Sequence, residues 1–522
     1  MNNKIDLLLI SPSNSKVTYQ GLSKKYSAIE PPTWALLLAQ SVRVKGFKVA
    51  LLDCLAEGLS HEQVQDRIEL LNPRIILFVV YGQNVNAGTT SMSGAISLSN
   101  FLKDKGIKQP IVYVGSHVQA LPVDTLVSEQ SIDIILTNEG VYALHNLLKL
   151  NSFHQNTLVN IKGLCFRLND KPFMTLPEKI VPQNLLEVDL PGYAYDLLPK
   201  NLKEFDLYRS PLWHAEYKED FRTPYAAIQT SLGCQFGCSF CMINIINRND
   251  NQEIGVASNY SGMRHWSIDF IIKEFDKLIS KGVYTIKIVD EMFLLNPKFY
   301  IPLCEELVKR NKEDKLKMWA YSRIDTVKNL DTLNLLRKAG IKWLCLGIES
   351  GRKNIRLEVS KGKFEEVDIK KVVDHIHQAG IEVMANYIYG LPGDDNDSIN
   401  ETFDLSKELC TSGWNTYTAI PLPGSQLYLE AKNKGQKLPS SYEAYSFHSY
   451  YTEPMPTEKL SGADLLKLRD KAFIDYHTAP KFLERIENKF GTIAKENIIN
   501  MTQIKLKRKL IEEQENTQLK ET

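Results

Sequence analysis

The sequence predicts two successive α/β domains followed by a mainly helical region, and three observations lead to this fold class. Short apolar runs alternate with helical patterns through the first 150 residues, and the alternation returns between about residues 225 and 435. A close group of three cysteines follows the first strand of the second series. Strands that alternate with helices form parallel sheets covered by helices. We place the domains at 1–150, 151–222, 223–435 and 436–522.

The first domain contains apolar runs of strand length separated by helical patterns. The runs cover residues 5–10, 48–52, 75–80, 111–114 and 134–136, and the helical patterns cover 33–45, 61–71, 91–105 and 142–150. Ligands of such sheets bind at the carboxyl ends of the strands. The loops at these ends are rich in small and polar residues, and they contain Ser11, Asp53, Tyr81, Gln83, Asn84, Gly115, Ser116, His117, Glu139 and Gly140. We therefore expect a ligand-binding face at this edge of the sheet.

A connector at 151–222 separates the two series, because proline, asparagine and aromatic residues interrupt the alternation there. The second series has strands expected at 226–229, 285–289, 317–321, 343–346, 382–388 and 416–420, and helices expected at 267–280, 297–310, 330–339, 367–379, 398–409 and 427–434. Six such units are consistent with a partial (β/α)6 barrel, whose active site lies where strands give way to loops. The region 436–522 has an aromatic-rich turn, then helices and a charged tail.

The three cysteines, Cys234, Cys238 and Cys241, have the spacing C-x3-C-x2-C on the first of these loops. Three thiolates can hold three corners of a four-iron cluster and leave the fourth iron open to a ligand. Two alternatives are buried structural thiols and a zinc knuckle. A zinc knuckle needs a fourth Cys or His nearby, and residues 243–248 contain neither.

The composition is that of an ordinary globular protein, with 43% hydrophobic and 24% charged residues. A net charge of +1 gives no electrostatic reason to expect binding to nucleic acid or to an anionic membrane. The apolar run near the amino terminus is too short for a signal peptide or a membrane span. The other five cysteines show no pairing pattern, as expected of reduced thiols. We therefore expect a cytoplasmic protein.

The cysteine spacing, with Phe240 just before the last cysteine, resembles the radical S-adenosylmethionine (SAM) superfamily over residues 223–435. The motifs at the later strand ends resemble it too, including Tyr389-Gly390-Leu391-Pro392-Gly393 at the fifth strand. The resemblance implies a [4Fe-4S] cluster on the three cysteines and a bound SAM. It implies that the SAM contacts include Phe240, Asp290, Glu291, Arg323, Glu349, Ser350 and Gly390.

Residues 1–150 and the connector resemble the cobalamin-binding subgroup of that superfamily, the class B methyltransferases. This implies a Rossmann-like cobalamin-binding domain whose contacts are the ten loop residues named above, from Ser11 to Gly140. The D-x-H-x-x-G signature of proteins that ligate cobalt through histidine is absent, which implies a lower face of cobalamin free of histidine. His117 is either a cobalamin contact or a hydrogen-bonded structural residue.

The implied activity is radical C-methylation of an unactivated carbon of a small molecule. A 5'-deoxyadenosyl radical takes a hydrogen from the substrate, and methylcobalamin delivers the methyl group. The implied partners are the small-molecule substrate and an electron donor such as flavodoxin or ferredoxin. Alternatives with the same cofactors are a ring contraction, cyclisation or oxidation without methylation. A methylthiotransferase would need a second cysteine trio near the amino terminus, where only Cys54 occurs. A non-catalytic sensor would need no open cluster.

Overall fold

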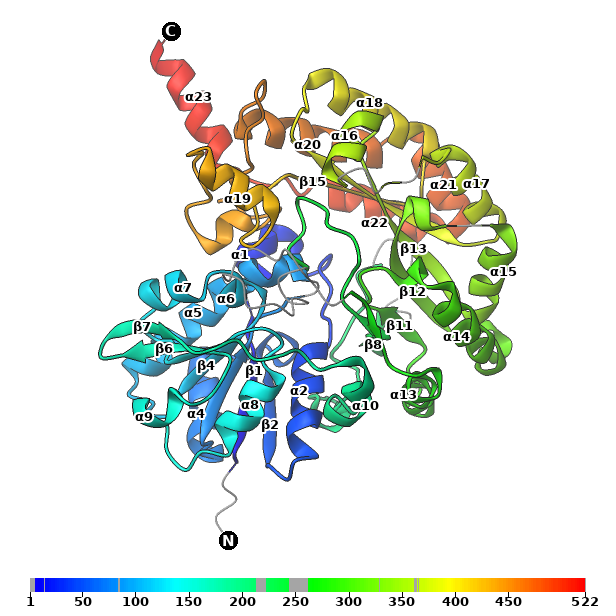
Figure 1. Ribbon diagram of the computed structural model, residues 1–522. Coiled ribbons are helices and arrows are strands. Elements are labelled where there is room, and N and C mark those ends of the chain that lie inside the picture. The colour runs from blue at the N-terminus through cyan, green and yellow to red at the C-terminus, as the bar shows by residue number, and fades with distance from the viewer. Residues whose placement is uncertain are drawn as a thin grey trace.

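The computed structural model describes residues 5–13, 15–82, 85–212, 222–243, 262–327, 329–360, 364 and 366–521. Gln83 and Asn84, two residues of the expected ligand face, lie outside these ranges. Figure 1 shows two α/β units, the amino-terminal one in blue and cyan and the second in green and yellow, with an orange segment near α19 between them and the red α23 projecting at the top.

The amino-terminal unit is a seven-stranded sheet with the order β2-β1-β3-β4-β5-β6-β7. Its strands are β1 (Leu7–Ser11), β2 (Val49–Asp53), β3 (Ile75–Val79), β4 (Ile111–Val114), β5 (Ile134–Leu136), β6 (Leu164–Leu168) and β7 (Lys171–Met174). Its helices are α1 (Ser15–Tyr19), η1 (Gln20–Leu22), α2 (Thr33–Arg43), α3 (Cys54–Glu57), α4 (His61–Leu71), η2 (Val85–Ala87), α5 (Gly88–Asp104), α6 (Ser116–Ala120), α7 (Pro122–Ser128) and α8 (Val141–Leu148).

Strand β1 shows why the sequence folds this way, because its side chains enter two different cores. Leu7 and Leu9 pack with α2 and α8 on one face of the sheet. Leu8 and Ile10 pack with α4 and α5 on the other face. All four side chains are fully buried. A continuous apolar run of this kind is typical of a parallel strand covered on both sides.

The connector adds two antiparallel strands to this sheet, which the sequence did not predict. Strand β6 pairs with β5, and β7 pairs with β6. The turn between them, Asn169-Asp170, has a positive φ at both residues, which is the geometry of a tight hairpin turn. The rest of the connector contains the short helices α9 (Gln155–Leu158), η3 (Gln183–Leu185), α10 (Leu186–Asp189) and η4 (Tyr195–Leu197). Buried aromatic residues of the connector join both units in one continuous core.

The second unit is the expected partial barrel of six parallel strands, in the order β15-β14-β13-β12-β11-β8. The strands are β8 (Tyr225–Ile228), β11 (Thr285–Ile288), β12 (Lys317–Arg323), β13 (Ile341–Glu349), β14 (Glu382–Tyr389) and β15 (Gly413–Thr418). The helices are α13 (Ile268–Ser280), η5 (Phe293–Leu295), α14 (Pro297–Arg310), η6 (Lys312–Asp314), η7 (Ile324–Thr326), α15 (Leu330–Ala339), α16 (Lys353–Val359), α17 (Ile369–Gln378), α18 (Asn396–Leu409) and α19 (Gln426–Asn433). The sequence predicts each strand to within a few residues of these bounds.

A short antiparallel ribbon, absent from the sequence expectation, joins the two sides of the cysteine loop. It pairs β9 (Ser231–Leu232) with β10 (Arg264–His265). Since β9 ends at Leu232, just before Gly233 and Cys234, the ribbon fixes where the cysteine loop begins. Arg264 of β10 also forms an ion pair with Glu139, on the loop after β5 of the other unit. Both side chains are almost fully buried.

The carboxyl-terminal region contains η8 (Tyr442–Tyr445), α20 (Gly462–His477), α21 (Pro480–Phe490), α22 (Thr492–Thr502) and α23 (Lys509–Glu521). Residues 442–449, which we call the bridging segment, contact both units. The Tyr442 hydroxyl donates to Glu129 over 2.9 Å, and the Ser446 hydroxyl donates to the Thr18 carbonyl over 3.0 Å. The ring of Phe447 lies 4.6 Å from that of Tyr417 in the barrel.

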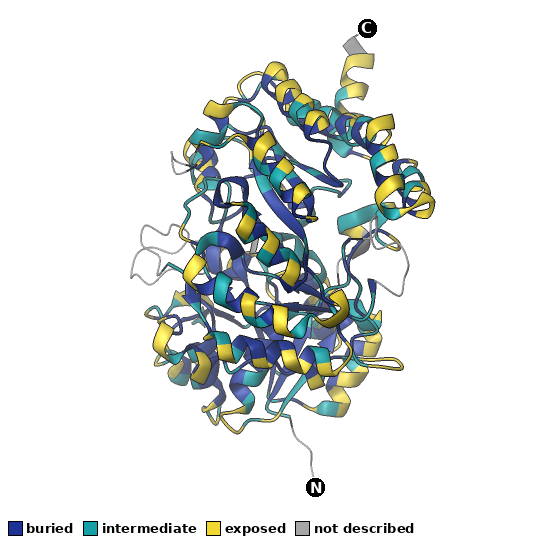
Figure 2. Cartoon of the chain, turned by 90° about the vertical axis from the view of Figure 1, so that its right-hand side faces the viewer, coloured by how far each residue is buried: buried dark blue, intermediate teal, exposed yellow. Residues whose placement is uncertain are grey.

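Burial follows this architecture, since the strands are mostly buried and the outer helix faces are exposed (Figure 2). In the described ranges, no helix has the length and apolar character needed to cross a membrane.

Candidate active site

The three cysteines lie together on the loop that follows β8 and β9, at the carboxyl edge of the barrel strands. Cys234 is buried, and Cys238 and Cys241 are half-buried. Burial raises the pKa of the Cys234 thiol to about 12 and that of Cys238 to about 11. Burial also raises the pKa of Cys241 well above its ordinary value. A bound metal centre would deprotonate such thiols, because its charge replaces the missing solvent.

Among the described residues, no group of three His, Cys, Asp or Glu side chains is arranged to hold a single metal ion. Three thiolates are a donor set that suits an iron–sulfur cluster, whose cysteine ligands bind different irons.

Two of the three sulfurs accept a hydrogen bond, and the third lies near a cation. The Phe236 backbone N–H donates to the Cys234 sulfur over 3.4 Å. The positive charge of Arg323 acts on the Cys238 thiol and opposes the rise in its pKa. The Asn86 carboxamide, from the amino-terminal unit, donates to the Cys241 sulfur over 3.7 Å. Donors of this kind orient metal ligands and stabilise their negative charge.

Two backbone hydrogen bonds fasten the middle of the cysteine loop to the barrel. The Ser239 N–H donates to the Val359 carbonyl over 2.9 Å, and the Leu427 N–H donates to the Ser239 carbonyl over 2.8 Å. The Phe240 ring packs against a cluster that includes Leu391. Phe240 therefore anchors the loop between α16 and α19.

Asp290 and Glu291 follow β11 and have different surroundings. The buried Asp290 carboxylate accepts hydrogen bonds from the Thr230 N–H and hydroxyl, at 2.6 and 2.5 Å, and from the Ser231 hydroxyl at 2.7 Å. Burial raises the pKa of Asp290. Its carboxylate thus holds the segment that leads into the cysteine loop. The charge of the half-buried Glu291 acts on Cys234 and Cys241, so Glu291 is the carboxylate nearer the cysteines.

Arg323 ends β12 and lies between aromatic rings beside Cys238. Its guanidinium pairs with both oxygens of Asp325, at 2.6 and 2.5 Å. The guanidinium carbon is 3.7 Å from the centre of the Phe236 ring and 4.7 Å from that of Phe364. This bidentate, stacked arrangement fixes the planar guanidinium next to the cysteine loop.

Glu349 ends β13 with a backbone conformation that is unusual for glutamate. Its φ of 65° is in the left-handed region, and such conformations cluster at functional sites. Burial raises the pKa of its carboxyl to about 7, although Arg323 acts in the opposite direction. Within the described ranges, no hydrogen bond to this carboxylate is formed. The neighbouring Ser350 stabilises the turn that follows β13, because its hydroxyl accepts a hydrogen bond from the Arg352 N–H over 3.2 Å.

The Gly390 loop after β14 is organised by Asp394, which sequence reasoning did not single out. The Gly390 and Leu391 N–H groups both donate to one Asp394 oxygen over 3.0 Å. Gly390 has a φ of 85°, and a Cβ there would lie 2.6 Å from Leu465 Cδ1. Glycine is therefore required at this position.

The inner face of the barrel keeps solvent-accessible surface next to these residues. Tyr321, Asn386, Asn415 and Tyr417 are half-buried, whereas their neighbours along the strands are buried. The Asn415 carboxamide donates to that of Asn386 over 3.3 Å. Sequence reasoning missed both asparagines, although an asparagine in an otherwise apolar strand is a usable signal.

A buried ion pair joins the barrel interior to the amino-terminal unit. Lys287 of β11 and Glu30, just before α2, are 2.8 Å apart and are 1% and 7% exposed. The Lys287 ammonium also lies 4.8 Å from the centre of the Trp319 ring and 5.2 Å from that of Tyr321. The ion pair therefore lies where the barrel interior meets the amino-terminal unit.

Several residues of the expected ligand face are engaged with protein groups. Asp53 caps α3 and accepts from the Tyr208 hydroxyl over 3.0 Å, and burial raises its pKa to about 6. His117 Nδ1 and the Thr89 hydroxyl are 3.1 Å apart. Burial lowers the pKa of His117 to about 4, so the imidazole is neutral at pH 7. Glu139 is engaged with Arg264, as described above.

The remaining residues of this face either allow the loops to pack closely or have a polar group without a hydrogen-bond partner among the described residues. The buried Tyr81 hydroxyl has no hydrogen-bond partner among the described residues. A Cβ on Gly115 would lie 2.4 Å from the Val80 carbonyl, so only glycine lets the two loops approach so closely. Gly140 has a φ of 75° at the start of α8. Ser116 is buried at the start of α6, and Ser11 is half-buried at the end of β1.

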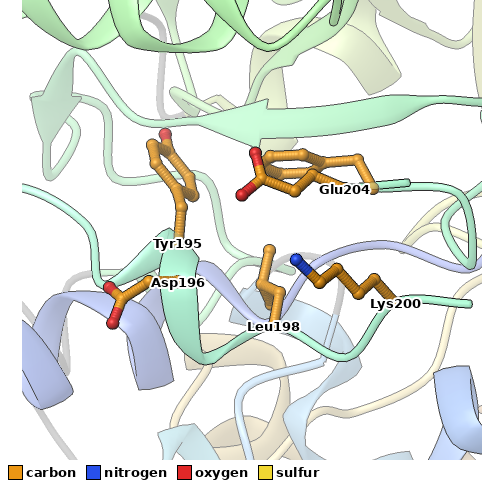
Figure 3. Close-up of a pocket in the computed structure, with 6 residues that line it drawn as sticks. Tyr195, Asp196, Leu198, Lys200 and Glu204 are labelled. Carbon is orange, nitrogen blue, oxygen red and sulfur yellow. The ribbon is translucent and has the colours of Figure 1, made fainter. Parts of the chain in front are cut away.

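A small hollow in the connector has an empty volume of about 240 Å³ (Figure 3). Its residues precede the cysteine loop in the sequence and do not include any residue of that loop. Its lining residues are Tyr195, Asp196, Leu198, Lys200, Glu204 and Phe205. Its two carboxylates are already used, since Asp196 pairs with Arg43 and Glu204 pairs with Lys281.

Comparison with known proteins supports the same domain arrangement. Residues 228–406 match the radical SAM superfamily. An uncharacterised methyltransferase of Pyrococcus horikoshii is 25% identical over 484 residues, which are 91% of this chain and 93% of the relative. An anaerobic magnesium-protoporphyrin IX monomethyl ester cyclase of Cereibacter sphaeroides is 23% identical over 450 residues, 84% of this chain and 65% of the relative.

A solved structure extends the likeness to nearly the whole fold. It is the radical SAM methyltransferase TsrM of Kitasatospora setae with cobalamin and a [4Fe-4S] cluster bound, at a TM-score of 0.65 and 15% identity, over 96% of this chain and 99% of that one. The expected fold class is confirmed, and so is the resemblance to cobalamin-dependent radical SAM enzymes. The match places a radical SAM domain at residues 228–406, which marks the chain as an enzyme.

Proposed function

We propose that this protein is a cobalamin-dependent radical SAM C-methyltransferase that acts on an unactivated carbon of a small molecule. The observation that carries the proposal is that segments following the strands of the amino-terminal sheet contact the cysteine loop of the barrel. Asn86 follows β3 and contacts Cys241, while Ala120, at the end of α6 after β4, packs in one cluster with Cys234 and Met242. Two cofactors bound at these two edges would face one another.

The residues at the barrel edge fit a cluster and SAM. Cys234, Cys238 and Cys241 would hold the cluster, which supplies the electron that cleaves SAM. Glu349 would accept hydrogen bonds from the ribose hydroxyls, since its carboxylate has no protein partner among the described residues. Arg323 and Glu291 would place a positive and a negative charge near the carboxylate and the amine of the methionyl part.

The amino-terminal edge fits a second, large cofactor less completely. Tyr81 has a buried hydroxyl without a partner among the described residues, and this hydroxyl would reach a cobalamin bound at the edge. Asp53, His117 and Glu139 already form hydrogen bonds or an ion pair with other protein groups. They would therefore stabilise the loops around the cofactor. When bound, cobalamin supplies the methyl group.

The half-exposed carboxamides and phenols inside the barrel would position the substrate. We propose a small-molecule substrate with an electron donor of the flavodoxin or ferredoxin class. A cytoplasmic location is consistent with the free thiols outside the cysteine loop.

A second candidate is a radical reaction with the same cofactors but without methyl transfer. The similarity to a protein named as a cyclase favours it. The cluster ligands do not distinguish the two candidates, because the two reactions differ in how the substrate is placed.

The test is an anaerobic reconstitution with iron, sulfide and hydroxocobalamin, followed by reaction with methyl-labelled SAM and small-molecule extracts. With a reduced flavodoxin added as the electron donor, we expect 5'-deoxyadenosine, S-adenosylhomocysteine and a product that carries the label. The Cys238→Ala variant should form none of them, while Cys304→Ala, which truncates a buried thiol in α14, should form all three. A product that appears together with 5'-deoxyadenosine but without the label would favour the second candidate. A wild-type protein that takes up no cluster would refute both.

A further inference from the structure

Asn86 holds the third cysteine of the loop from the other unit of the protein. It lies in η2, and 155 residues separate it from Cys241. Its Nδ2 donates to the Cys241 sulfur over 3.7 Å, and its Oδ1 accepts from the Met242 backbone N–H over 3.2 Å. One carboxamide therefore engages the side chain of Cys241 and the backbone of the next residue.

The Met242 N–H determines which way the carboxamide points. A backbone N–H can only donate, so the atom facing it has to be the carbonyl oxygen. The amino group of Asn86 is thereby directed at the sulfur. A flipped carboxamide would place two donors together at Met242 and two electron pairs together at Cys241, and both contacts would be repulsive.

The position of Asn86 is itself fixed by the start of α5. The hydroxyls of Thr90 and Ser91 both donate to the Ala87 carbonyl, over 2.8 and 3.2 Å. Around the half-buried cysteine, the buried side chains of Ala120, Met242 and Met292 limit the access of water. A hydrogen bond in such a low-dielectric environment has a larger electrostatic effect than one in water.

The Cys234 sulfur accepts from the Phe236 N–H of its own loop. The Cys241 sulfur accepts from Asn86, which belongs to the other unit. The amino-terminal unit thus supplies a hydrogen-bond donor to one of the three cysteines that would hold the cluster.

We propose that Asn86 is a positioning residue for the cluster ligand Cys241 and that its hydrogen bond raises the reduction potential of the cluster. The inference rests on the proposed function in requiring that the cluster binds here. Reduction adds negative charge to the cluster and its thiolates, and a donor to a thiolate sulfur stabilises the reduced state. The cluster potential would then depend on contact between the two units of the chain.

The test compares Asn86→Ala and Asn86→Asp with the wild type after anaerobic reconstitution with iron and sulfide. Aspartate keeps the side-chain shape and the acceptor for Met242, but it replaces the donor with an oxygen. Asn160→Ala is the matched control, because Asn160 is exposed and its side chain donates to the Asn156 carbonyl. Iron content per chain and the midpoint potential, followed by electron paramagnetic resonance at pH 8, are measured for each protein.

We expect both Asn86 variants to have a more negative midpoint potential than the wild type, with Asn86→Asp the more negative. Asn160→Ala should match the wild type. If Asn86→Ala loses the cluster, Asn86→Asp carries the comparison alone. Wild-type potentials in the Asn86 variants would overturn the inference and leave the proposed function intact. Absence of a cluster in the wild type would instead refute the proposed function.

Discussion

Replacing Glu349 by glutamine should stabilise the protein while weakening its site. Burial raises the pKa of this carboxyl from 4.5 to about 7, with Arg323 opposing the shift and Asp325 adding to it. The folded state therefore binds the Glu349 proton more tightly than the unfolded state does. The stability that protonated Glu349 contributes is present below pH 4.5 and is lost as the pH rises through about 7.

The size of the effect follows from the shift. At about 1.4 kcal/mol per pKa unit, the difference between the two pKa values corresponds to about 3 kcal/mol. The Glu349 side chain keeps some accessible surface, and screening by solvent reduces the figure to about 1–2 kcal/mol. Glutamine carries no charge at any pH, so Glu349→Gln avoids this loss. At pH 8 the variant should melt about 1–3 °C above the wild type.

The assay is thermal unfolding of the ligand-free protein at several pH values from 5 to 8. The gain in melting temperature should be near zero at pH 5 and should grow toward pH 8. Glu358→Gln, on the exposed face of α16, is the control and should show no such trend. In the reconstituted enzyme, the same Glu349 substitution should weaken SAM binding about tenfold, since a hydrogen bond to a charged group is lost. A gain that is equal at pH 5 and pH 8, or no gain at either, would refute the reasoning.

Two further substitutions test how the cysteine loop is held. Arg264→Met leaves the buried Glu139 charge without its ion-pair partner and should lower the free energy of unfolding by about 3–5 kcal/mol, measured by heat or urea. Adding Glu139→Gln should recover most of this loss. A double variant that is no more stable than Arg264→Met would count against the ion pair. Asp290→Asn turns an acceptor oxygen into a donor that faces Thr230 and Ser231. It should cost about 1–3 kcal/mol and lower the iron content after reconstitution, whereas unchanged iron would show that Asp290 does not position the loop.

The sheets could be predicted from the sequence because their strands are buried on both faces. The run predicted at 75–80 is β3, Ile75–Val79, and the run at 111–114 is β4. The hairpin of β6 and β7 was missed because its turn is Asn169-Asp170, with no glycine to mark it. The ribbon of β9 and β10 was missed because each of its strands has only two residues, too few to show a period.

The site could be predicted in outline, since the cysteine spacing and the strand ends identify its place. The role of each carboxylate could not be predicted. Asp290 and Glu291 are neighbours at the same strand end, yet Asp290 is held by Thr230 and Ser231 while Glu291 lies near the cysteines. Which one faces a ligand depends on a bend in a loop 60 residues earlier in the chain. The assignments of the SAM and cobalamin contacts stay predictions.

The bridging segment, residues 442–449, has a consequence for the order of events during translation. Its contacts with Glu129 and Thr18 connect it to the amino-terminal unit, and Phe447 connects it to the barrel. Both sheets leave the ribosome before this segment does. The contacts of the bridging segment with the two units can therefore form only after both sheets have been synthesised.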